Sequence, residues 1–231
     1  MSRRGDLLRT VLRGIGQTLI TFGLVVLLFC FYELKVTNLV TARAQDQLGD
    51  ELRRSWADPP ARPAPGAASV AEVPLGTGIA VLRIPRLGDW NDQPPVVVEG
   101  VGVEDLKEGP GHMPKTAQPG ELGNVVISGH RTTYGAPFNR LGELEPGDAV
   151  VIETRDSWFT YTVTGSRIVA PTAIEVTYPV PGQRGAEPTS RLLTFTTCHP
   201  KYSAQQRLVV TSELTASSKK SDGPPAALAS G

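Results

Sequence analysis

The sequence has 231 residues, 40% of them hydrophobic, and its 23 basic residues are balanced by 23 acidic ones, so the net charge at pH 7 is zero. This balance gives no electrostatic reason to bind nucleic acid, and the composition does not fit a disordered acidic protein. The length allows one domain with attached segments, and the abundance of proline and glycine favours many turns and short strands.

The first predicted element is an uncharged apolar run from Gly14 to Tyr32. At ~1.5 Å per residue, this run makes a helix of roughly 28 Å, which is enough to cross a bilayer core. Four arginines precede it, whereas Lys35 and Arg43 are the only basic residues among the next twenty. The positive-inside rule therefore predicts residues 1–13 in the cytoplasm, residues 14–32 in the cell membrane and the rest of the chain outside the cell.

A cleavable signal peptide is the alternative interpretation of the N-terminal segment. Ala42, Arg43 and Ala44 have the A-x-A form of a cleavage site. This site lies about ten residues beyond the apolar run and carries a charge, and the apolar region of a signal peptide is usually only about 7–15 residues long. We therefore expect an uncleaved, single-pass anchor.

Residues 33–75 are expected to form a stalk and a linker. Val36–Arg54 carries apolar residues at near-helical spacing, which predicts a short stalk helix. Trp56–Pro74 is rich in proline and alanine, a composition typical of an extended, semi-rigid spacer. At the other end of the chain, residues 216–231 lose the hydrophobic pattern and are expected to be a disordered tail.

The main domain, residues 76–215, is predicted to be all-β, because short strands joined by Pro/Gly connections favour a closed barrel or a sandwich. The predicted strands are Ile79–Ile84, Val96–Val101, Asn124–Ser128, Ala149–Glu153, Phe159–Val169, Leu192–Cys198 and Arg207–Leu214. Short helical turns are expected at Val103–Glu108 and Pro137–Leu144. Pro171–Ser190 is expected to be an irregular loop that covers a cleft.

The most informative stretch is Leu192–Arg207, with the sequence LLTFTTCHPKYSAQQR. It begins as an uncharged strand, Pro200 stops that strand, and a polar turn leads into a second strand. If the two strands are antiparallel neighbours, Cys198 and Arg207 lie at the two lips of the turn. A guanidinium in this position can stabilise a thiolate or a developing oxyanion.

Cys198 is the only cysteine outside the predicted membrane helix, because Cys30 lies within it. A buried structural cysteine is the alternative interpretation of this residue. However, an exported domain has reason to avoid a spare thiol, and Cys198 stands at a strand end next to a polar turn. We predict that Cys198 is a nucleophile.

Three histidines are candidates for the base that this nucleophile needs. His130 ends the apolar strand VVISGH and is the preferred candidate, with Gly129 leaving room for a ligand or a neighbouring strand. His112 lies in the Gly/Pro-rich segment GPGHMP and is expected to shape that loop. His199 follows Cys198 directly, and neighbours on a strand point to opposite faces.

Structural interpretations remain open for these residues. His130 could be a solvated histidine at a strand end, and Arg207 could be a surface residue. A zinc site formed by Cys198, His130 and His199 is a further alternative, but the sequence has no tight ligand pair such as C-x₂-C or H-x₃-H. We therefore expect no metal and no other cofactor.

Two separated motifs resemble those of the sortases, the cysteine transpeptidases of Gram-positive bacteria. TFTTCHPKYSAQQR, with its arginine nine residues after the cysteine, resembles their active-site segment. Asn124–Asp148, NVVISGHRTTYGAPFNRLGELEPGD, resembles their histidine segment, in detail that of class E. The resemblance covers roughly Gly78–Leu214 and the membrane anchor, and it implies a closed eight-stranded β-barrel. The L,D-transpeptidases, also cysteine enzymes of the cell wall, carry an S-H-G-C segment that this sequence lacks.

The resemblance also implies a reaction. Cys198 would attack the Thr–Gly carbonyl of a sorting signal, Arg207 would stabilise the oxyanion, and His130 would protonate the leaving amine. The implied partners are secreted proteins with a C-terminal sorting signal, of LAXTG type in place of LPXTG for class E, and a lipid II-type amine of the cell-wall precursor. By the same resemblance, Thr197 is the preferred residue for binding the sorting signal. Further candidates for substrate binding are Thr196, Tyr134 and Tyr202.

Two alternatives to a wall-anchoring sortase stay open. A pilin-polymerising sortase often carries a lid over the cleft or a second, C-terminal membrane helix, whereas residues 216–231 are short and polar. A non-catalytic, sortase-like wall-binding protein would tolerate the loss of Cys198, His130 or Arg207, and the sequence retains all three.

Overall fold

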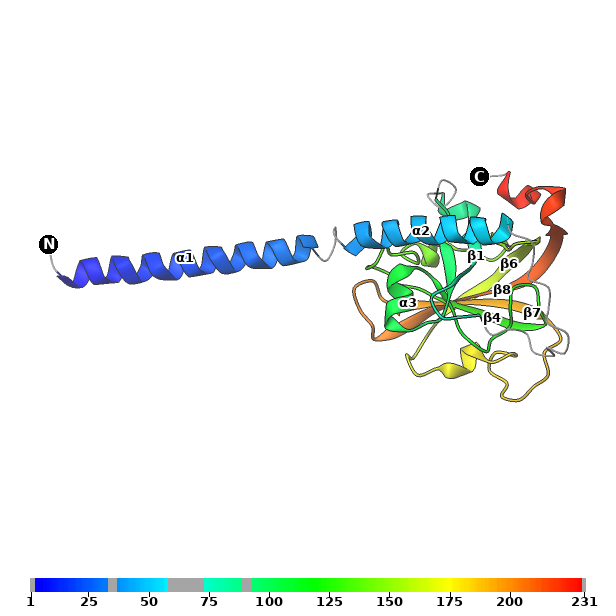
Figure 1. The fold of residues 1–231 in the computed structure, drawn as a ribbon. Coiled ribbons are helices and arrows are strands. Elements are labelled where there is room, and N and C mark those ends of the chain that lie inside the picture. Colours follow the sequence, from blue (N-terminus) through cyan, green and yellow to red (C-terminus); the bar gives the residue numbers. More distant parts are fainter. Residues whose placement is uncertain (1–2, 33–36, 58–72, 89–92, 230–231) are drawn as a thin grey trace.

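The computed structural model describes residues 3–32, 37–57, 73–88 and 93–229. Figure 1 shows helix α1 (Arg3–Phe31) extending away from a β-barrel and helix α2 (Thr37–Ala57) lying along that barrel. Within α1, Arg9–Phe31 is long and apolar enough to cross a membrane, and none of it is buried against the rest of the protein. The helix therefore begins several residues before the predicted span, and its direction across a membrane stays a prediction.

Eight strands form a closed barrel in the order β1-β2-β3-β4-β7-β8-β6-β5, which confirms the expected eight-stranded barrel. The strands are β1 (Gly78–Arg83), β2 (Val96–Glu99), β3 (Gly111–His112), β4 (Gly123–Ser128), β5 (Ala149–Glu153), β6 (Ser157–Val169), β7 (Arg191–His199) and β8 (Gln206–Lys219). The β2–β3 and β4–β7 pairs are parallel, and the other pairs are antiparallel. β7 thus has a parallel neighbour on one side and an antiparallel neighbour on the other.

One hydrophobic cluster fills the barrel interior. Leu82, Ile127, Tyr161 and Phe195 are fully buried there, each from a different strand. Because successive residues of a strand point to opposite faces, the alternating branched and aromatic residues of the predicted strands supply this core. The short helices are α3 (Val103–Glu108), which has its predicted bounds, and the 3-10 helices Pro85–Leu87, Leu141–Glu143, Ile174–Thr177, Lys220–Asp222 and Ala226–Leu228.

The helical expectation for residues 137–144 is only partly met, because turns lead into a single 3-10 helix at Leu141–Glu143. The segment predicted as a loop around His112 contains β3, a two-residue strand that is too short to give a periodic pattern. His112 is fully buried, with Nδ1 2.7 Å from Oε2 of Glu99 and Nε2 3.0 Å from the carbonyl oxygen of Ala117. His112 is thus part of the barrel wall, and not of a loop rim.

The expectation of a disordered tail from residue 216 is wrong for its first part. β8 continues to Lys219, which pairs with Ser157 of β6. Lys220 then lies 2.7 Å from Oε1 of Glu153 and 3.7 Å from the ring centre of Trp56. The small polar residues at the end of β8 carry no hydrophobic pattern, but their main chain completes the ladder with the long strand β6.

Helix α2 forms where a stalk helix was predicted, but it is docked on the barrel. Leu48 and Leu52 are buried against Val96 and Val98 of β2. The Gln45 side chain accepts a hydrogen bond from the Val96 amide at 2.7 Å, and it donates to the carbonyl of Glu108 at 2.7 Å. The segment acts as part of the folded domain, whereas most of the predicted Pro/Ala-rich linker lies outside the described residues.

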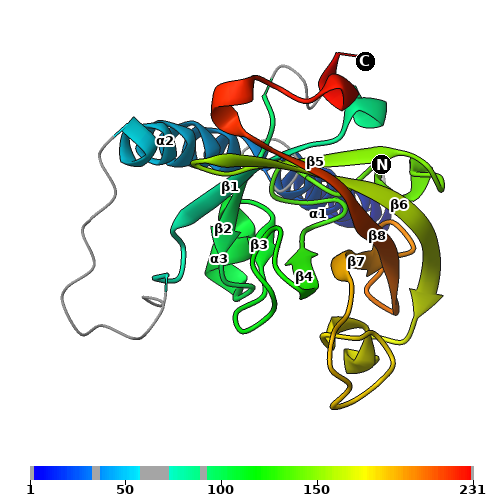
Figure 2. The same ribbon diagram turned by 90° about the vertical axis from the view of Figure 1, so that its right-hand side faces the viewer.

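The connection between β6 and β7 is irregular, as expected, apart from one 3-10 helix at Ile174–Thr177. Figure 2 shows it as the yellow segment below β7. Asn124 at the start of β4 donates hydrogen bonds to the carbonyls of Val176, at 3.0 Å, and Tyr178, at 3.1 Å. These bonds fix the first half of the connection, which begins directly after Val169, the partner of Arg207 in the β6–β8 ladder.

Candidate active site

Three adjacent strands bring the predicted catalytic residues to the same end of the barrel. In the parallel β4–β7 ladder Ser128 is level with Thr196, and in the antiparallel β7–β8 ladder Cys198 is directly opposite Arg207. Directly opposite residues have Cβ atoms about 4.5–5.5 Å apart. The predicted juxtaposition of Cys198 and Arg207 across the turn is therefore confirmed.

The pairing of β4 with β7 continues past the last ladder residue. The Gly129 amide donates to the Thr196 carbonyl at 3.2 Å, and the Thr197 hydroxyl donates to the Gly129 carbonyl at 2.8 Å. By this continued register His130, two residues beyond the end of β4, is level with Cys198, which is opposite Arg207. We call these three predicted catalytic residues the catalytic row.

Cys198 lies at the end of β7 on the outward side of the strand. Leu193, Phe195 and Thr197 are buried, whereas Thr196 and Cys198 are only half-buried. Because side chains alternate along a strand, Cys198 shares its face with Thr196 and not with the core residues. The Cys198 thiol is free and partly exposed.

His130 is half-buried, and burial lowers the pKa of its imidazole from the ordinary value. Its Nδ1 lies 3.4 Å from the Thr133 hydroxyl, and its ring centre lies 4.9 Å from that of Tyr134. Tyr134 has a φ of 52°, in the left-handed region that non-glycine residues rarely adopt. The ring of Tyr134, a residue predicted to contact substrate, thus packs beside the imidazole of His130.

The space beside Gly129 is filled by a core side chain. A Cβ atom on Gly129 would lie 2.7 Å from the ring of Phe138. Phe138 is fully buried and packs edge-on against Phe195, with 5.3 Å between ring centres. The prediction that this glycine leaves room for a ligand or a neighbouring strand is therefore wrong: it lets Phe138 pack beneath the residue that precedes His130.

The guanidinium of Arg207 is folded against the turn that joins β7 to β8. Its Nη1 donates hydrogen bonds to the carbonyls of Ala204 and Gln206, both at 3.0 Å. In the described part of the chain, its Nε and Nη2 donate no hydrogen bond. The turn thus holds one nitrogen of the fork and leaves two able to donate.

The two threonines before Cys198 differ in position. Thr197 is buried and its hydroxyl is bonded to Gly129, so it joins the cysteine strand to the histidine segment. Thr196 lies on the face of Cys198, with its hydroxyl 2.7 Å from that of Ser128. The geometry favours Thr196 over the preferred Thr197 as a neighbour of bound substrate, and such a role stays a prediction for both.

The remaining predicted residues lie around the turn. Tyr202 is 84% exposed and has a φ of 66°. His199 has its Nδ1 3.3 Å from Nη1 of Arg131. Among the described residues, no group of three histidine, cysteine, aspartate or glutamate side chains could hold a metal ion.

Arg131 is a residue of the site for which we predicted no role from the sequence. It is only 8% exposed, and its Nη1 donates to the carbonyl of Cys198 at 3.3 Å. Its position directly after His130 was the available signal, but sequence alone does not show that a charged residue at a strand end turns inward.

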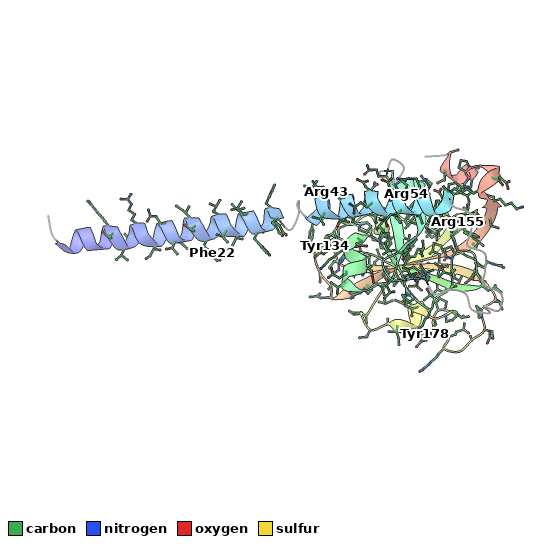
Figure 3. All side chains as sticks on the ribbon, viewed as in Figure 1. Phe22, Arg43, Arg54, Tyr134, Arg155 and Tyr178 are labelled. Atoms are coloured by element: carbon green, nitrogen blue, oxygen red, sulfur yellow. The ribbon has the colours of Figure 1, made fainter. Side chains whose placement is uncertain are left out.

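A groove of about 750 Å³ lies between α2 and the barrel, away from the catalytic row. It is lined by α2 residues such as Thr41, Gln45 and Arg53 and by barrel residues such as Tyr134, Asn139 and Glu153. Figure 3 shows Tyr134 at the end of the barrel where α2 begins. The groove reaches the loop after His130, but none of the three catalytic-row residues lines it.

Comparisons with known proteins agree with this geometry. A family model described as "Sortase domain" matches residues 82–215. The chain is 34% identical over 226 residues to sortase SrtE1 from Streptomyces coelicolor, a match that covers 94% of this chain and 61% of that protein.

Solved structures show the same fold. The structure of sortase E from Streptomyces avermitilis is 42% identical, with a TM-score of 0.61 over 68% of this chain and 99% of that one. A crystal structure of sortase E1 from Streptomyces coelicolor, with a tripeptide in its active site, is 35% identical, with a TM-score of 0.61 over the same shares of the two chains.

The lowered pKa of His130 can be measured directly. Burial disfavours the imidazolium, so its proton should leave at a pH below the ordinary value of 6.5. The measurement is an NMR titration of ¹⁵N-labelled histidines in the full chain in detergent micelles. The Cys198→Ala background removes the neighbouring thiol, and His130→Gln assigns the signal. A midpoint above 6.5 would show that a nearby negative charge outweighs burial.

Proposed function

The chain belongs to the sortase family, and from this premise we propose that it is a membrane-anchored class E cysteine transpeptidase that cleaves an LAXTG-type sorting signal between Thr and Gly. The observation that carries the proposal is the catalytic row, in which the thiol of β7 lies between the guanidinium of β8 and the segment after β4 that carries the imidazole. The acceptor is an amine of a lipid II-type wall precursor, and the product is a protein joined to the cell wall.

In the first step the Cys198 thiolate attacks the carbonyl carbon of the Thr–Gly bond. The C–S bond forms, and the carbonyl oxygen becomes an oxyanion. Arg207, opposite Cys198 in the ladder, donates to this oxygen from the nitrogens that the turn leaves unbonded. A donor held beforehand by its own turn needs little rearrangement when the charge appears.

In the second step the His130 imidazolium gives its proton to the glycine nitrogen, and the C–N bond breaks. A thioester remains between the threonine carbonyl and Cys198. An incoming amine attacks this thioester while neutral His130 takes its proton, and the thiolate leaves. Because burial lowers the pKa of His130, the imidazolium is the minor form at neutral pH. Only a fraction of the enzyme is therefore ready for the first step at any moment.

The proposed location follows from α1. Arg9–Phe31 can cross a bilayer, and arginines precede the apolar run, which supports a cytoplasmic N-terminus and a barrel outside the cell. An anchored barrel meets both a membrane-bound wall precursor and secreted proteins as they leave the membrane. Sortase E1 of Streptomyces coelicolor holds a tripeptide in its active site, which supports a peptide substrate for this chain as well.

The first test of this function is the nucleophile. The full chain in detergent should cleave LAXTG peptides and join the acyl fragment to an added amine, as followed by mass spectrometry. Cys198→Ala should lose both activities and stay folded, because removing a small side chain at a strand end leaves little cavity. Cys30→Ala is the matched control and should keep both activities. Cleavage by Cys198→Ala would exclude the thioester mechanism.

Arg207 supplies the second test. An oxyanion forms only during the attack, so its donor lowers the barrier without tightening substrate binding. Arg207→Lys keeps the charge but loses the planar fork, and kcat should fall ~10²–10³-fold with a much smaller change in KM. The matched control is Arg167→Lys, an exposed arginine on the neighbouring strand β6. Wild-type turnover by Arg207→Lys would reduce Arg207 to a source of charge.

A further inference from the structure

Arg131 is a buried cation with an incomplete set of partners. Its Nη1 bonds the Cys198 carbonyl and lies 3.3 Å from Nδ1 of His199, while its buried Nε has no hydrogen-bond partner. Among the residues that the structure describes, no ion pair joins it to a carboxylate. A charge in this state is costly unless an anion lies near it.

The guanidinium is also held rigidly. The Asn139 side chain donates to the Arg131 carbonyl at 2.9 Å, which fixes the backbone beneath the side chain. Gly142 allows the close approach of Nη2, because a Cβ atom there would lie 3.1 Å from it. The segment after His130 therefore places this cation under the end of β7 from the buried side of the barrel.

The electrostatics connect Arg131 to the nucleophile. Burial lowers the pKa of Arg131, and the negative charge of Cys198 acts in the opposite direction and raises it. An arginine keeps its proton in proteins, so the effect that can be observed lies on the cysteine. Because such coupling is reciprocal, a cation that the thiolate stabilises must stabilise the thiolate in return.

We propose that Arg131 is a positioning residue for the nucleophile: it fixes the end of β7 through the Cys198 carbonyl and stabilises the Cys198 thiolate by its charge. Arg131 and Arg207 then have different roles. Arg131 acts on the ground state of the enzyme before substrate arrives, and Arg207 acts on the oxyanion during the attack. This inference deepens the proposed function and rests on it for the role of the thiolate.

A purely structural role is the competing explanation. An arginine that only held the Cys198 carbonyl would contribute to stability and would leave the ionisation of the thiol unchanged. The two roles are separated by the pH dependence of alkylation, in which the thiolate sulfur displaces iodide from iodoacetamide. This reaction needs no sorting signal and no acceptor amine.

The experiment uses the full chain in detergent in a Cys30→Ala background, so that Cys198 is the only thiol. The alkylation rate is measured against pH for Arg131, Arg131→Met and Arg131→Lys, with circular dichroism to verify folding. Arg191→Met is the matched control, because Arg191 also donates to a backbone carbonyl, that of Gly120, but at the opposite end of β7.

The expected result is a midpoint about one pH unit higher in Arg131→Met, with alkylation at pH 7 about tenfold slower, because losing a nearby opposite charge typically moves a titration midpoint by about one unit or more. Arg131→Lys keeps a charge at the site and should stay near the unsubstituted chain, as should Arg191→Met. An unchanged midpoint in folded Arg131→Met would overturn the proposal. If that variant does not fold, a rise of a full unit in Arg131→Lys would overturn it equally.

The outcome is independent of the proposed function. If the chain cleaves no sorting signal but Arg131→Met shifts the alkylation midpoint, the function is wrong and the coupling stands. If the chain is an active transpeptidase and the midpoint does not move, the function stands and Arg131 is structural.

Discussion

The register of β7 between β4 and β8 is the constraint on which the site depends. β7 pairs in parallel with β4, which leads to His130, and antiparallel with β8, which carries Arg207. Each side of β7 therefore contributes one member of the catalytic row. A slip of one residue would turn Cys198 to the opposite face of the strand. The hydrogen bonds donated by the Thr197 hydroxyl and the Gly129 amide oppose this slip, because they continue the pairing up to the residue before His130. The hydrogen bonds that fix the pairing of β4 with β7 therefore also set the positions of the predicted catalytic residues.

Charge at the site follows from burial. The half-buried imidazole of His130 favours its neutral form, whereas the proposed reaction begins with an imidazolium and a thiolate side by side. In the proposed mechanism the guanidiniums of Arg131 and Arg207 favour the Cys198 thiolate, and like charges of this kind disfavour a further positive charge on the histidine. The fraction of enzyme that carries both the thiolate and the imidazolium therefore depends on the balance of these two effects. Arg131 lies on the buried side and the guanidinium of Arg207 lies against the turn. Each arginine can therefore be substituted without disturbing the other.

The sequence predicted those features that follow from local pattern. Short apolar runs separated by Pro/Gly connections located seven of the eight strands, and the polar turn placed Cys198 opposite Arg207. The two-residue β3 was missed because it is too short for periodicity, and the end of β8 was missed because Lys219 and its polar neighbours are held by main-chain pairing alone. Long-range packing could not be predicted either, because no sequence pattern shows that Phe138 fills the space beside Gly129 or that the Arg131 side chain turns inward.

The central claim, that Cys198 carries the acyl group between donor and acceptor, is tested most directly by trapping that intermediate. The full chain is incubated with an LAXTG peptide in the absence of an amine, quenched in acid and mapped by mass spectrometry. We expect the acyl fragment ending in threonine on Cys198, through a bond that hydroxylamine cleaves as it does a thioester. Peptide cleavage without any adduct on Cys198, or with the adduct on another residue, would exclude Cys198 as the carrier of the acyl group.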